Sequence, residues 1–423
     1  MKNDLGINIF GFIDGEFGLG TAVRLLLESI KNANIKHTIY NFDRSLGKFS
    51  KDLNAYNNEN KVHYYINLIL VGNEDIDAVL WQLEKDNFLE NTYSIFYLNW
   101  ESESFPLRYA FNISFFDEVW VATNYCREII SKYVDVPVQV IQYPILEHKD
   151  NATSIDTENF YDKSKFNFLF LFDYNSSFER KNPIGLINAF KTAFEADDKK
   201  VMLTIKTSKT NSYKFERELL FNSIEGYNNI RIVENTFSNS DLNFIIENCD
   251  SYISLHRSEG FGLTMAEAMS YKKPVIATAY SGNLEFMNEQ NSFLVDFDKK
   301  VLENNTVHYE KGTIWSEPNI NNAAELIKKV FSNTIEVQNI ALNGYQDIHD
   351  KFSVNKIGKL IENRMLKIYS IDKKSNIKNN LIYLKNNNSA MSLKLRILNK
   401  NVIVKLIYKI KMFIRDKKKK NKF

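Results

Sequence analysis

Residues 258–269, SEGFGLTMAEAM, decide the fold of this chain. A short apolar run at 252–255 precedes them and has the character of a strand, and residues 264–269 continue them with helical spacing. Gly260 and Gly262 allow the backbone to bend and to approach a ligand closely. The free N–H groups of the following helix would point at this turn, so the stretch predicts an anion site.

Two glutamates, Glu259 and Glu267, lie on either side of the glycine turn. Each carboxylate accepts hydrogen bonds and can therefore bind hydroxyl groups. A phosphate flanked by hydroxyls is the pattern that a nucleotide-sugar presents. The stretch thus predicts a nucleotide-sugar site between a strand and a helix.

The composition indicates an ordinary globular protein of two or three domains. The chain has 423 residues, of which 44% are hydrophobic and 25% charged. Its two cysteines, Cys126 and Cys249, lie far apart without a CxxC pattern, which argues against a disulfide framework or a zinc site. No secretory leader is recognisable, and no apolar run approaches the roughly 20 residues of a spanning helix. We therefore expect a cytoplasmic protein.

Strand and helix patterns alternate along most of the chain, as in open parallel sheets. The chain is therefore expected to be α/β, with two consecutive doubly wound domains whose ligand lies in a cleft between them. Expected helices are 21–34, 182–196, 321–332 and 354–369. Expected strands are 7–13, 37–42, 64–71, 78–83, 94–100, 118–123, 136–143, 166–172, 201–206, 230–234, 251–255 and 274–278.

The predicted domain boundaries follow these patterns. Residues 1–150 form the first domain, a polar linker at 147–165 follows, and residues 160–340 form the second domain. Residues 341–370 are expected to include a helix that crosses back to the first domain. Residues 371–423 form a basic tail.

The basic tail differs from the rest of the chain in charge. Residues 371–423 contain 16 Lys/Arg and two Asp/Glu, whereas residues 1–370 contain 38 and 50. An acidic body with a basic tail favours an anionic partner at the tail. Apolar residues recur at helical spacing within 400–423, with lysines on the other faces, which suits a helix lying on an anionic membrane surface. The alternative is a helix docked on the body.

Glycines and cations follow the expected strands at two further places. Gly15, Gly18 and Gly20 stand between the first strand and the first helix, where they form either a phosphate loop or a bare turn. Their GxxGxG order differs from the dinucleotide fingerprint GxGxxG and disfavours a dehydrogenase. Arg180 and Lys181 follow the strand FLFLF, where they either neutralise a leaving diphosphate or remain solvated surface charges.

Several other polar residues are candidates for the same site. Ser281 and Gly282 follow another strand and offer backbone N–H groups. Glu101 ends a strand and either faces the site or caps a turn, and His256 either lines the pocket or is structural. Two Asp-x-Asp triplets, at 75–77 and 296–298, lack a supporting cluster, so no metal is expected.

Together, these residues resemble those of a known family. Arg180-Lys181-Asn182-Pro183, the run from Glu259 to Glu267 and Ser281-Gly282 are similar to the motifs of the GT-B glycosyltransferases of family 4, the group 1 retaining enzymes. Glu259 and Glu267 match the family's E-x7-E motif. The resemblance covers roughly residues 5–365, and it includes Trp100-Glu101 and the sequence WSEP at 315–318.

The resemblance implies two Rossmann-like domains and sugar transfer from a nucleotide-sugar with retention of configuration, with neither an obligatory metal nor a cofactor. It implies that Glu259 holds the donor sugar and Glu267 its ribose. Phe261, Gly262 and Leu263 would contact phosphate and sugar through the backbone, together with Gly260. Further implied roles are stabilisation of the leaving diphosphate by Lys181 and contact of Gly18 and Gly20 with the phosphates.

The sequence departs from the family pattern at two places. Phe172-Asp173 replaces a common Gly-Arg, for which Arg180 is the substitute, and Trp100-Glu101 stands where many relatives have a histidine. Glu101 is therefore assigned to the catalytic group. The expected acceptor is a glycan or a lipid-linked intermediate of bacterial surface polysaccharide synthesis. The alternatives are a nucleotide-sugar epimerase and a non-catalytic nucleotide-sugar-binding protein; a nucleic-acid partner is not expected, because no RNA- or DNA-binding signature accompanies the tail.

Overall fold

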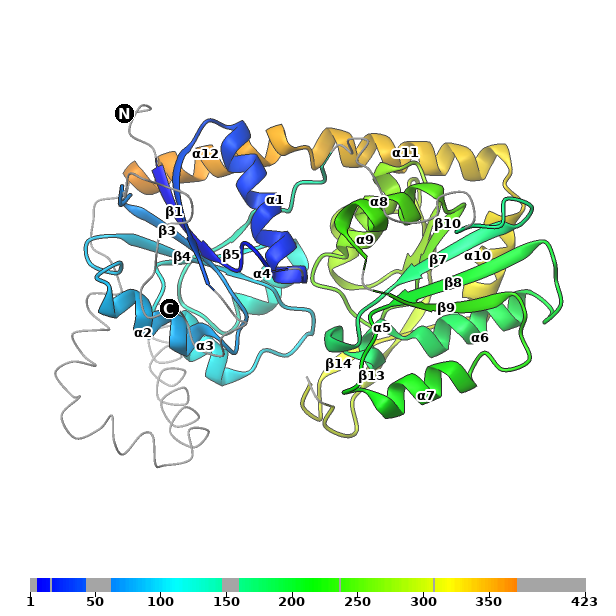
Figure 1. The fold of residues 1–423 in the computed structure, drawn as a ribbon. Coiled ribbons are helices and arrows are strands. Elements are labelled where there is room, and N and C mark those ends of the chain that lie inside the picture. The colour runs from blue at the N-terminus through cyan, green and yellow to red at the C-terminus, as the bar shows by residue number, and fades with distance from the viewer. Residues whose placement is uncertain are drawn as a thin grey trace, which may run out of the picture. The chain divides into compact units, whose positions relative to one another are not determined.

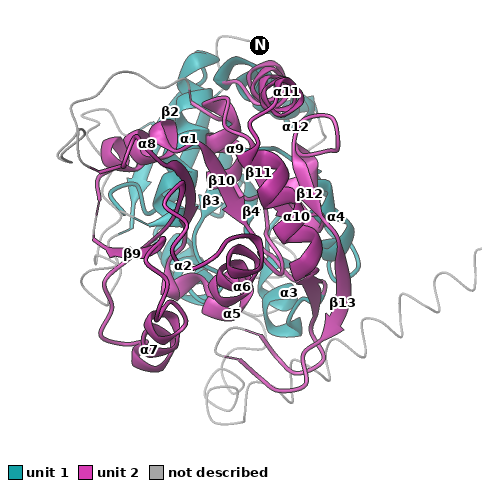
Figure 2. Cartoon of the chain, turned by 90° about the vertical axis from the view of Figure 1, so that its right-hand side faces the viewer, with its two compact units in different colours: residues 1–99, 104–144, 354–423 teal, residues 100–103, 145–353 magenta. Residues whose placement is uncertain are grey.

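The structure, a computed structural model, describes residues 6–15, 17–42, 62–146, 160–235, 237–306 and 309–370. These residues form two compact α/β units, which Figure 2 colours separately. Among them, unit 1 consists of the residues up to Asn99, of Ser104–Pro144 and of those from Val354 onward. Unit 2 consists of Trp100–Glu103 and Ile145–Ser353.

Unit 1 is built on a six-stranded parallel sheet in the order β2-β1-β3-β4-β5-β6, with helices on both faces (Figure 1). The strands are β1 (Gly6–Gly11), β2 (Lys36–Asn41), β3 (Ile66–Leu70), β4 (Tyr93–Leu98), β5 (Glu118–Val121) and β6 (Val138–Val140). The helices are α1 (Gly18–Asn32), α2 (Ile76–Lys85), α3 (Leu107–Ile113), α4 (Asn124–Ile130) and α12 (Val354–Ser370).

The central strands of unit 1 are buried along their whole length, as expected of a parallel sheet covered on both faces. The buried amide of Asn8 on β1 donates to Asn67 Oδ1 on β3 at 2.8 Å, and Asn67 Nδ2 lies 3.0 Å from Ser94 Oγ on β4. Buried polar groups that find partners across neighbouring strands favour one register.

Helix α12 completes unit 1, although more than two hundred residues of the chain separate it from β6, the preceding element of that unit. It packs against α1, where Gly358 lies so close to Ser29 that an added Cβ would come within 2.6 Å of the Ser29 carbonyl oxygen. Arg364 pairs through two nitrogens with the fully buried Glu118, which also accepts hydrogen bonds from Tyr93 (2.9 Å) and Trp120 (2.7 Å).

Unit 2 has a second six-stranded parallel sheet, in the order β12-β11-β10-β7-β8-β9, and a separate antiparallel pair, β13-β14. The strands are β7 (Phe166–Leu171), β8 (Val201–Thr207), β9 (Ile230–Glu234), β10 (Ser251–Ser254), β11 (Val275–Thr278), β12 (Phe293–Val295), β13 (Phe297–Val301) and β14 (Ile314–Pro318). The helices are α5 (Phe178–Lys181), α6 (Pro183–Ala193), α7 (Lys214–Asn222), α8 (Asn239–Asn248), α9 (Leu263–Ser270), α10 (Ile320–Phe331) and α11 (Ile335–Lys351).

The strand order of each unit defines a point where successive crossovers change direction. In unit 2 the order follows the pattern 6-5-4-1-2-3, the dinucleotide-binding arrangement, and the change falls between β7 and β10. In unit 1 the change falls between β1 and β3. Ligands of such sheets bind outside the carboxyl ends of the strands at these points.

One expected strand, 78–83, is wrong, because these residues lie within helix α2. The run AVLWQL is too short for its periodicity to separate a strand from a helix. In the helix, Val79 and Leu83 are fully buried at a spacing of four, whereas Trp81 is 60% exposed. The other expected strands are confirmed, with ends shifted by a few residues.

The remaining expectations fall partly outside the described residues. Residues 147–159 of the expected linker and the whole tail, 371–423, lie there. Both cysteines are buried, and no disulfide joins them. In the part of the chain that the structure describes, no helix combines the length and the apolar character needed to cross a membrane.

Candidate functional site

Two loops of unit 2 bring most of the candidate residues together at the change of strand order. Arg180 and Lys181 lie on α5, which follows β7, and residues 255–262 follow β10. Because β7 and β10 are parallel neighbours, their carboxyl ends open at the same edge of the sheet. The fold thus places these loops at the expected ligand position.

Helix α5 is a single turn held in an unusual backbone conformation. Ser177 before it has φ = 67° and Asn182 after it has φ = 54°, both in the left-handed region that non-glycine residues rarely adopt. The side chain of Ser177 accepts from the Arg180 N–H at 3.4 Å, and Asn182 Nδ2 donates to the Leu255 carbonyl at 2.9 Å. Such a conformation persists where its surroundings hold it, and it often occurs at functional sites.

Glu259 binds both cations of α5. Its Oε1 lies 2.5 Å from Lys181 Nζ and its Oε2 lies 3.0 Å from Arg180 Nη1. Burial acts to raise the pKa of Glu259, but the two cations outweigh it and lower this pKa to about 2. Burial lowers the pKa of Lys181, against the opposing attraction of Glu259. The three side chains form one buried ionic cluster with a surplus positive charge.

Arg180 is the centre of this cluster. It donates to the carbonyl oxygens of Ser258 at 2.7 Å and Ser176 at 2.9 Å, and its Nη2 lies 3.9 Å from Glu101 Oε1. The backbone carbonyl of Glu101 accepts a hydrogen bond from the Ser258 hydroxyl. Glu101 is thus placed beside Arg180, within the segment Trp100–Glu103 that belongs to unit 2.

Tyr309 is a member of the cluster that the sequence did not reveal. Burial raises the pKa of its phenol, and the carboxylates of Glu101 and Glu259 raise it further, whereas Arg180 lowers it. Tyr309 lies in the connection between β13 and β14, which shows no motif in the sequence. Only the folded chain brings it near Arg180.

The GFG turn needs its two glycines for different reasons. Gly262 has φ = +92°, and a Cβ there would come within 2.4 Å of Met265 Cε. A Cβ at Gly260 would lie 2.7 Å from the Trp100 carbonyl oxygen. Phe261 between them is buried against Phe286, with 5.1 Å between ring centroids, so the contacts it can offer a ligand come from its backbone.

Helix α9 starts at Leu263, directly after this turn, and no side chain caps its N-terminus. Ser281 and Gly282 hold the turn by hydrogen bonds to the backbone of Glu259. The Glu259 N–H donates to Ser281 Oγ at 2.8 Å, and the Gly282 N–H donates to the Glu259 carbonyl at 2.9 Å. The Gly282 N–H is therefore engaged with the backbone of Glu259, whereas Ser281 contacts that backbone through its hydroxyl oxygen, as an acceptor.

Glu267 lies on α9, and its side chain is partly exposed. Burial raises its pKa to about 7, and its carboxylate has no ion pair or hydrogen bond with another described residue. The Tyr252 hydroxyl donates to Thr264 Oγ1 at 2.8 Å; its pKa is raised by burial and further by Glu259 and Glu267. Both glutamates therefore lie within electrostatic range of one buried tyrosine.

His256 is fully buried beside the cluster. Burial lowers its pKa to about 4; Glu259 opposes this shift, and Lys181 and Arg180 add to it. Asn283 also acts to raise the pKa, but neither ring nitrogen makes a hydrogen bond of standard geometry with a described residue. The imidazole is thus neutral at pH 7.

The glycine turn of unit 1 also lies at a change of strand order. Helix α1 begins at Gly18 with no side-chain cap, and a Cβ at Gly20 would come within 1.9 Å of the Gly15 carbonyl oxygen. A Cβ at Gly18 would meet nothing within 4 Å. Arg24 holds the turn by donating to the carbonyls of Ile13 (2.8 Å) and Gly15 (2.9 Å).

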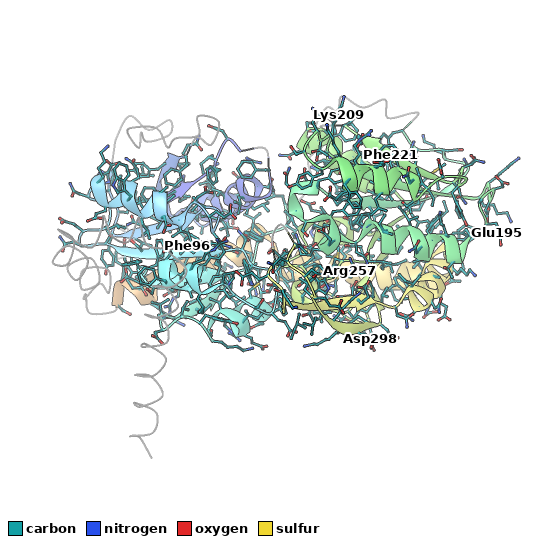
Figure 3. All side chains as sticks on the ribbon, turned by 90° about the horizontal axis from the view of Figure 1, so that it is seen from below. Phe96, Glu195, Lys209, Phe221, Arg257 and Asp298 are labelled. Atoms are coloured by element: carbon teal, nitrogen blue, oxygen red, sulfur yellow. The ribbon has the colours of Figure 1, made fainter. Side chains whose placement is uncertain are left out.

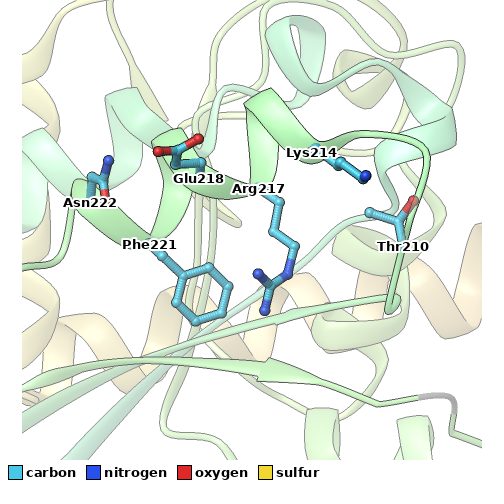
Figure 4. Close-up of a pocket in the computed structure, with 6 residues that line it drawn as sticks. All are labelled: Thr210, Lys214, Arg217, Glu218, Phe221 and Asn222. Atoms are coloured by element: carbon cyan, nitrogen blue, oxygen red, sulfur yellow. The ribbon is translucent and has the colours of Figure 1, made fainter.

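The structure shows one groove away from these residues. It has a volume of about 560 Å³ and lies along α7 (Figure 4). None of the candidate residues lines it; its lining consists of Thr210, Lys214, Arg217, Glu218, Phe221 and Asn222. Within the described residues, no three His, Cys, Asp or Glu side chains lie together as a metal site would require.

Comparisons with known proteins agree with this arrangement. Residues 157–347 match the family model described as "Glycosyl transferases group 1". No curated protein matches the chain. Among solved structures, sucrose-phosphate synthase from Thermosynechococcus elongatus superimposes with a TM-score of 0.62 at 14% identity, over 86% of this chain and 99% of that one.

Two further similar structures have bound ligands. Anabaena HepE in complex with UDP and glucose has a TM-score of 0.58 at 11% identity, over 86% of this chain and 100% of its own. A point mutant of S. aureus TarM, in complex with fondaparinux, α-GlcNAc-glycerol and UDP, has a TM-score of 0.52 at 16% identity, over 71% of this chain. This chain spans about half the length of the TarM chains, 55% and 54% in two structures.

The two Rossmann-like units and their similarity to these solved structures define a protein of the GT-B fold class. Within that class, residues 157–347 are similar to the group 1 glycosyltransferases.

Proposed function

We propose that this protein is a retaining glycosyltransferase that moves a sugar from a nucleoside-diphosphate donor to a hydroxyl of a glycan or lipid-linked acceptor. The observation that supports this most strongly is the ionic cluster of Arg180, Lys181 and Glu259. It sets two cations and a carboxylate at the ligand edge of a dinucleotide-type sheet. The group 1 domain match covers all three residues.

In this proposal the leaving diphosphate is stabilised by charge. Lys181 and Arg180, together with the uncapped N-terminus of α9, meet the negative charge that develops when the sugar–phosphate bond breaks. The family resemblance assigns Gly18 and Gly20, at the uncapped start of α1, a role toward the phosphates as well. No metal is required for this step, because the protein supplies the positive charge.

The carboxylates recognise the sugar and the ribose. Glu259 accepts hydrogen bonds from donor sugar hydroxyls once the diphosphate competes for its two cations, and Glu267, which has no partner among the described residues, accepts them from the ribose. Glu101 lies next to Arg180 and completes the polar wall. The acceptor hydroxyl then attacks from the face that the diphosphate has left, and its proton passes to the leaving phosphate.

A thermal-shift panel tests donor binding. UDP-glucose and UDP-N-acetylglucosamine come first, because the HepE and TarM structures contain UDP; GDP-mannose and ADP-glucose follow. A donor that binds the folded state raises the thermal midpoint, and Glu267→Ala should abolish the rise. Turnover to a product of the same anomeric configuration, read by proton NMR, supports the transferase. Donor binding without any turnover would instead favour a non-catalytic binding protein.

The acceptor and the location of the protein are further parts of the proposal. We propose action at the cytoplasmic face of an anionic membrane in bacterial surface polysaccharide synthesis, with residues 400–423 as the anchor. This rests on the charge contrast between the tail and residues 1–370. Sedimentation with phosphatidylglycerol vesicles compares the full chain with residues 1–370. Equal binding of both would dismiss the anchor without affecting the transferase.

A further inference from the structure

The β13-β14 pair in unit 2 has no role in the proposed reaction, yet it contacts the loop that carries Arg180 and Lys181. Its second strand contains the sequence IWSEP. The contacts run through Arg257, which follows β10 and lies one residue before Ser258 of the GFG segment. Figure 3 labels Arg257 among the side chains of unit 2.

Arg257 joins β14 to helix α5. Its Nε and Nη2 donate to the two carboxylate oxygens of Glu317 at 3.0 and 2.6 Å, which is a bidentate pair. Its Nη1 donates to the Glu179 carbonyl at 2.5 Å, and its backbone N–H donates to the Arg180 carbonyl at 2.7 Å. One residue therefore holds two consecutive carbonyls of α5.

Strand β14 fixes Arg257 in turn. Ser316 donates to the Arg257 carbonyl through its N–H at 2.9 Å and through its hydroxyl at 2.8 Å. The Arg257 guanidinium lies 5.4 Å from the centroid of the Trp315 ring, and that ring packs edge-on against Tyr309 at 6.1 Å. Tyr309 interacts electrostatically with Arg180. The β13-β14 strand pair is thus connected to the ionic cluster both through Arg257 and through Tyr309.

Helix α5 needs external support because its own hydrogen bonds are few. It has four residues, and both residues that flank it, Ser177 and Asn182, have positive φ. Such positions are strained for residues other than glycine and persist only where the surroundings compensate. The bonds from Arg257 add to the contacts of Ser177 and Asn182 in fixing the backbone that carries both cations.

We infer that Glu317, acting through Arg257, is a positioning residue for Arg180 and Lys181. It touches neither cation and aligns them with the place where charge develops in the reaction. Misplacing a reacting group by about 1 Å costs on the order of a hundredfold in rate. The inference rests on the proposed function, because it concerns the rate of that reaction.

The variant Glu317→Gln tests this inference in the full chain. With a sugar nucleotide that the wild-type protein turns over, we expect kcat to fall about tenfold to a hundredfold, while the Kd for that donor changes less than about threefold. Glu317→Asp, which keeps the charge, should recover part of the loss. The matched control is Glu234→Gln, since Glu234 on β9, at one edge of the sheet, forms a bidentate pair with Arg217.

A double-mutant cycle separates positioning from general loss of structure. In a Lys181→Met background, Glu317→Gln should lower kcat by a smaller factor than it does in the wild-type background, because one of the two cations that it aligns is already gone. A folded Glu317→Gln protein with wild-type kcat would overturn the inference, and so would an equal loss in both backgrounds. If the wild-type protein turns over no donor at all, the proposed function fails instead.

Discussion

Replacing Lys181 with methionine should abolish most of the activity and leave the stability almost unchanged. Lys181 Nζ lies 2.5 Å from Glu259 Oε1, and the Lys181 side chain is 18% exposed. Methionine keeps the length of the aliphatic chain and removes the charge. If Lys181 meets the leaving diphosphate, the loss of one such donor lowers kcat by about 10²–10³-fold, which corresponds to about 3–4 kcal/mol.

The stability term follows from two opposing contributions. At 2.5 Å, the attraction between unit charges is about 7 kcal/mol at an effective dielectric constant of 20. The pKa of Lys181 is nevertheless lowered, so the cost of burying the ammonium, together with its repulsion by Arg180, exceeds this attraction. Methionine removes both contributions, and Arg180 still pairs with Glu259 at 3.0 Å. We therefore expect a change of less than about 1 kcal/mol, or roughly 2–4 °C in the thermal midpoint.

The assay combines thermal unfolding without ligand and steady-state turnover of the donor found in the thermal-shift panel. Arg217→Met serves as a control, because Arg217 also pairs with a glutamate but lies on α7 and contacts none of the candidate residues. A Lys181→Met protein that keeps more than about a tenth of the wild-type kcat would refute the role of the cation. A thermal midpoint of Lys181→Met far below that of the wild type would show that the attraction between Lys181 and Glu259 exceeds the cost of burying the ammonium.

Three further outcomes are expected. The folded-state pKa of Glu259 is lowered to about 2, so its ionised form stabilises the protein above about pH 4.5 and this contribution is lost as the pH falls through about 2; urea unfolding at several pH values should show a steeper loss of stability in the wild type than in Glu259→Gln, and equal slopes would contradict the shift. The pKa of Glu267 is raised to about 7, and hydrogen bonds from donor hydroxyls favour its ionised form, so donor binding near pH 6.5 should release a proton from this carboxyl group. Calorimetry in two buffers of different ionisation enthalpy measures the proton release, and the same release in Glu267→Gln would contradict the prediction. Gly262→Ala and Gly312→Ala, at φ = +92° and +89°, should each cost about 1 kcal/mol in unfolding free energy, because the added Cβ meets only the end of the flexible Met265 side chain in the first and open space in the second; a much larger loss in Gly262→Ala would show that Met265 cannot move aside.

Sequence patterns predicted most of the fold because parallel strands that are buried on both faces read as continuous apolar runs. The run INLIL of β3 and the run FLFL within β7 are such cases. The same rule failed for AVLWQL, since four to eight apolar residues fit either a strand or a buried helix face. The exposed Trp81 within this run decides for the helix.

The candidate site was predictable where residues follow their own strand. The positions of Arg180, Lys181 and Glu259 after β7 and β10 could be read from the order of elements along the chain. Their direct ion pairing could not, because it depends on the left-handed turns at Ser177 and Asn182. The engagement of the Gly282 N–H with Glu259 also depends on the folded backbone. Whether these residues bind and transfer a sugar remains a prediction.

The late arrival of α12 in the chain has a consequence for synthesis. All strands of the first sheet have left the ribosome once Val140 has emerged, yet Arg364, which neutralises the buried Glu118, is made only after the whole of unit 2. Until then, Glu118 lacks the cation that matches its charge in the described structure, and the face of α1 beside Ser29 stays bare. Unit 1 therefore cannot be completed until the residues of unit 2 have been made, and a nascent chain stalled before Val354 would present an unfinished first unit to chaperones.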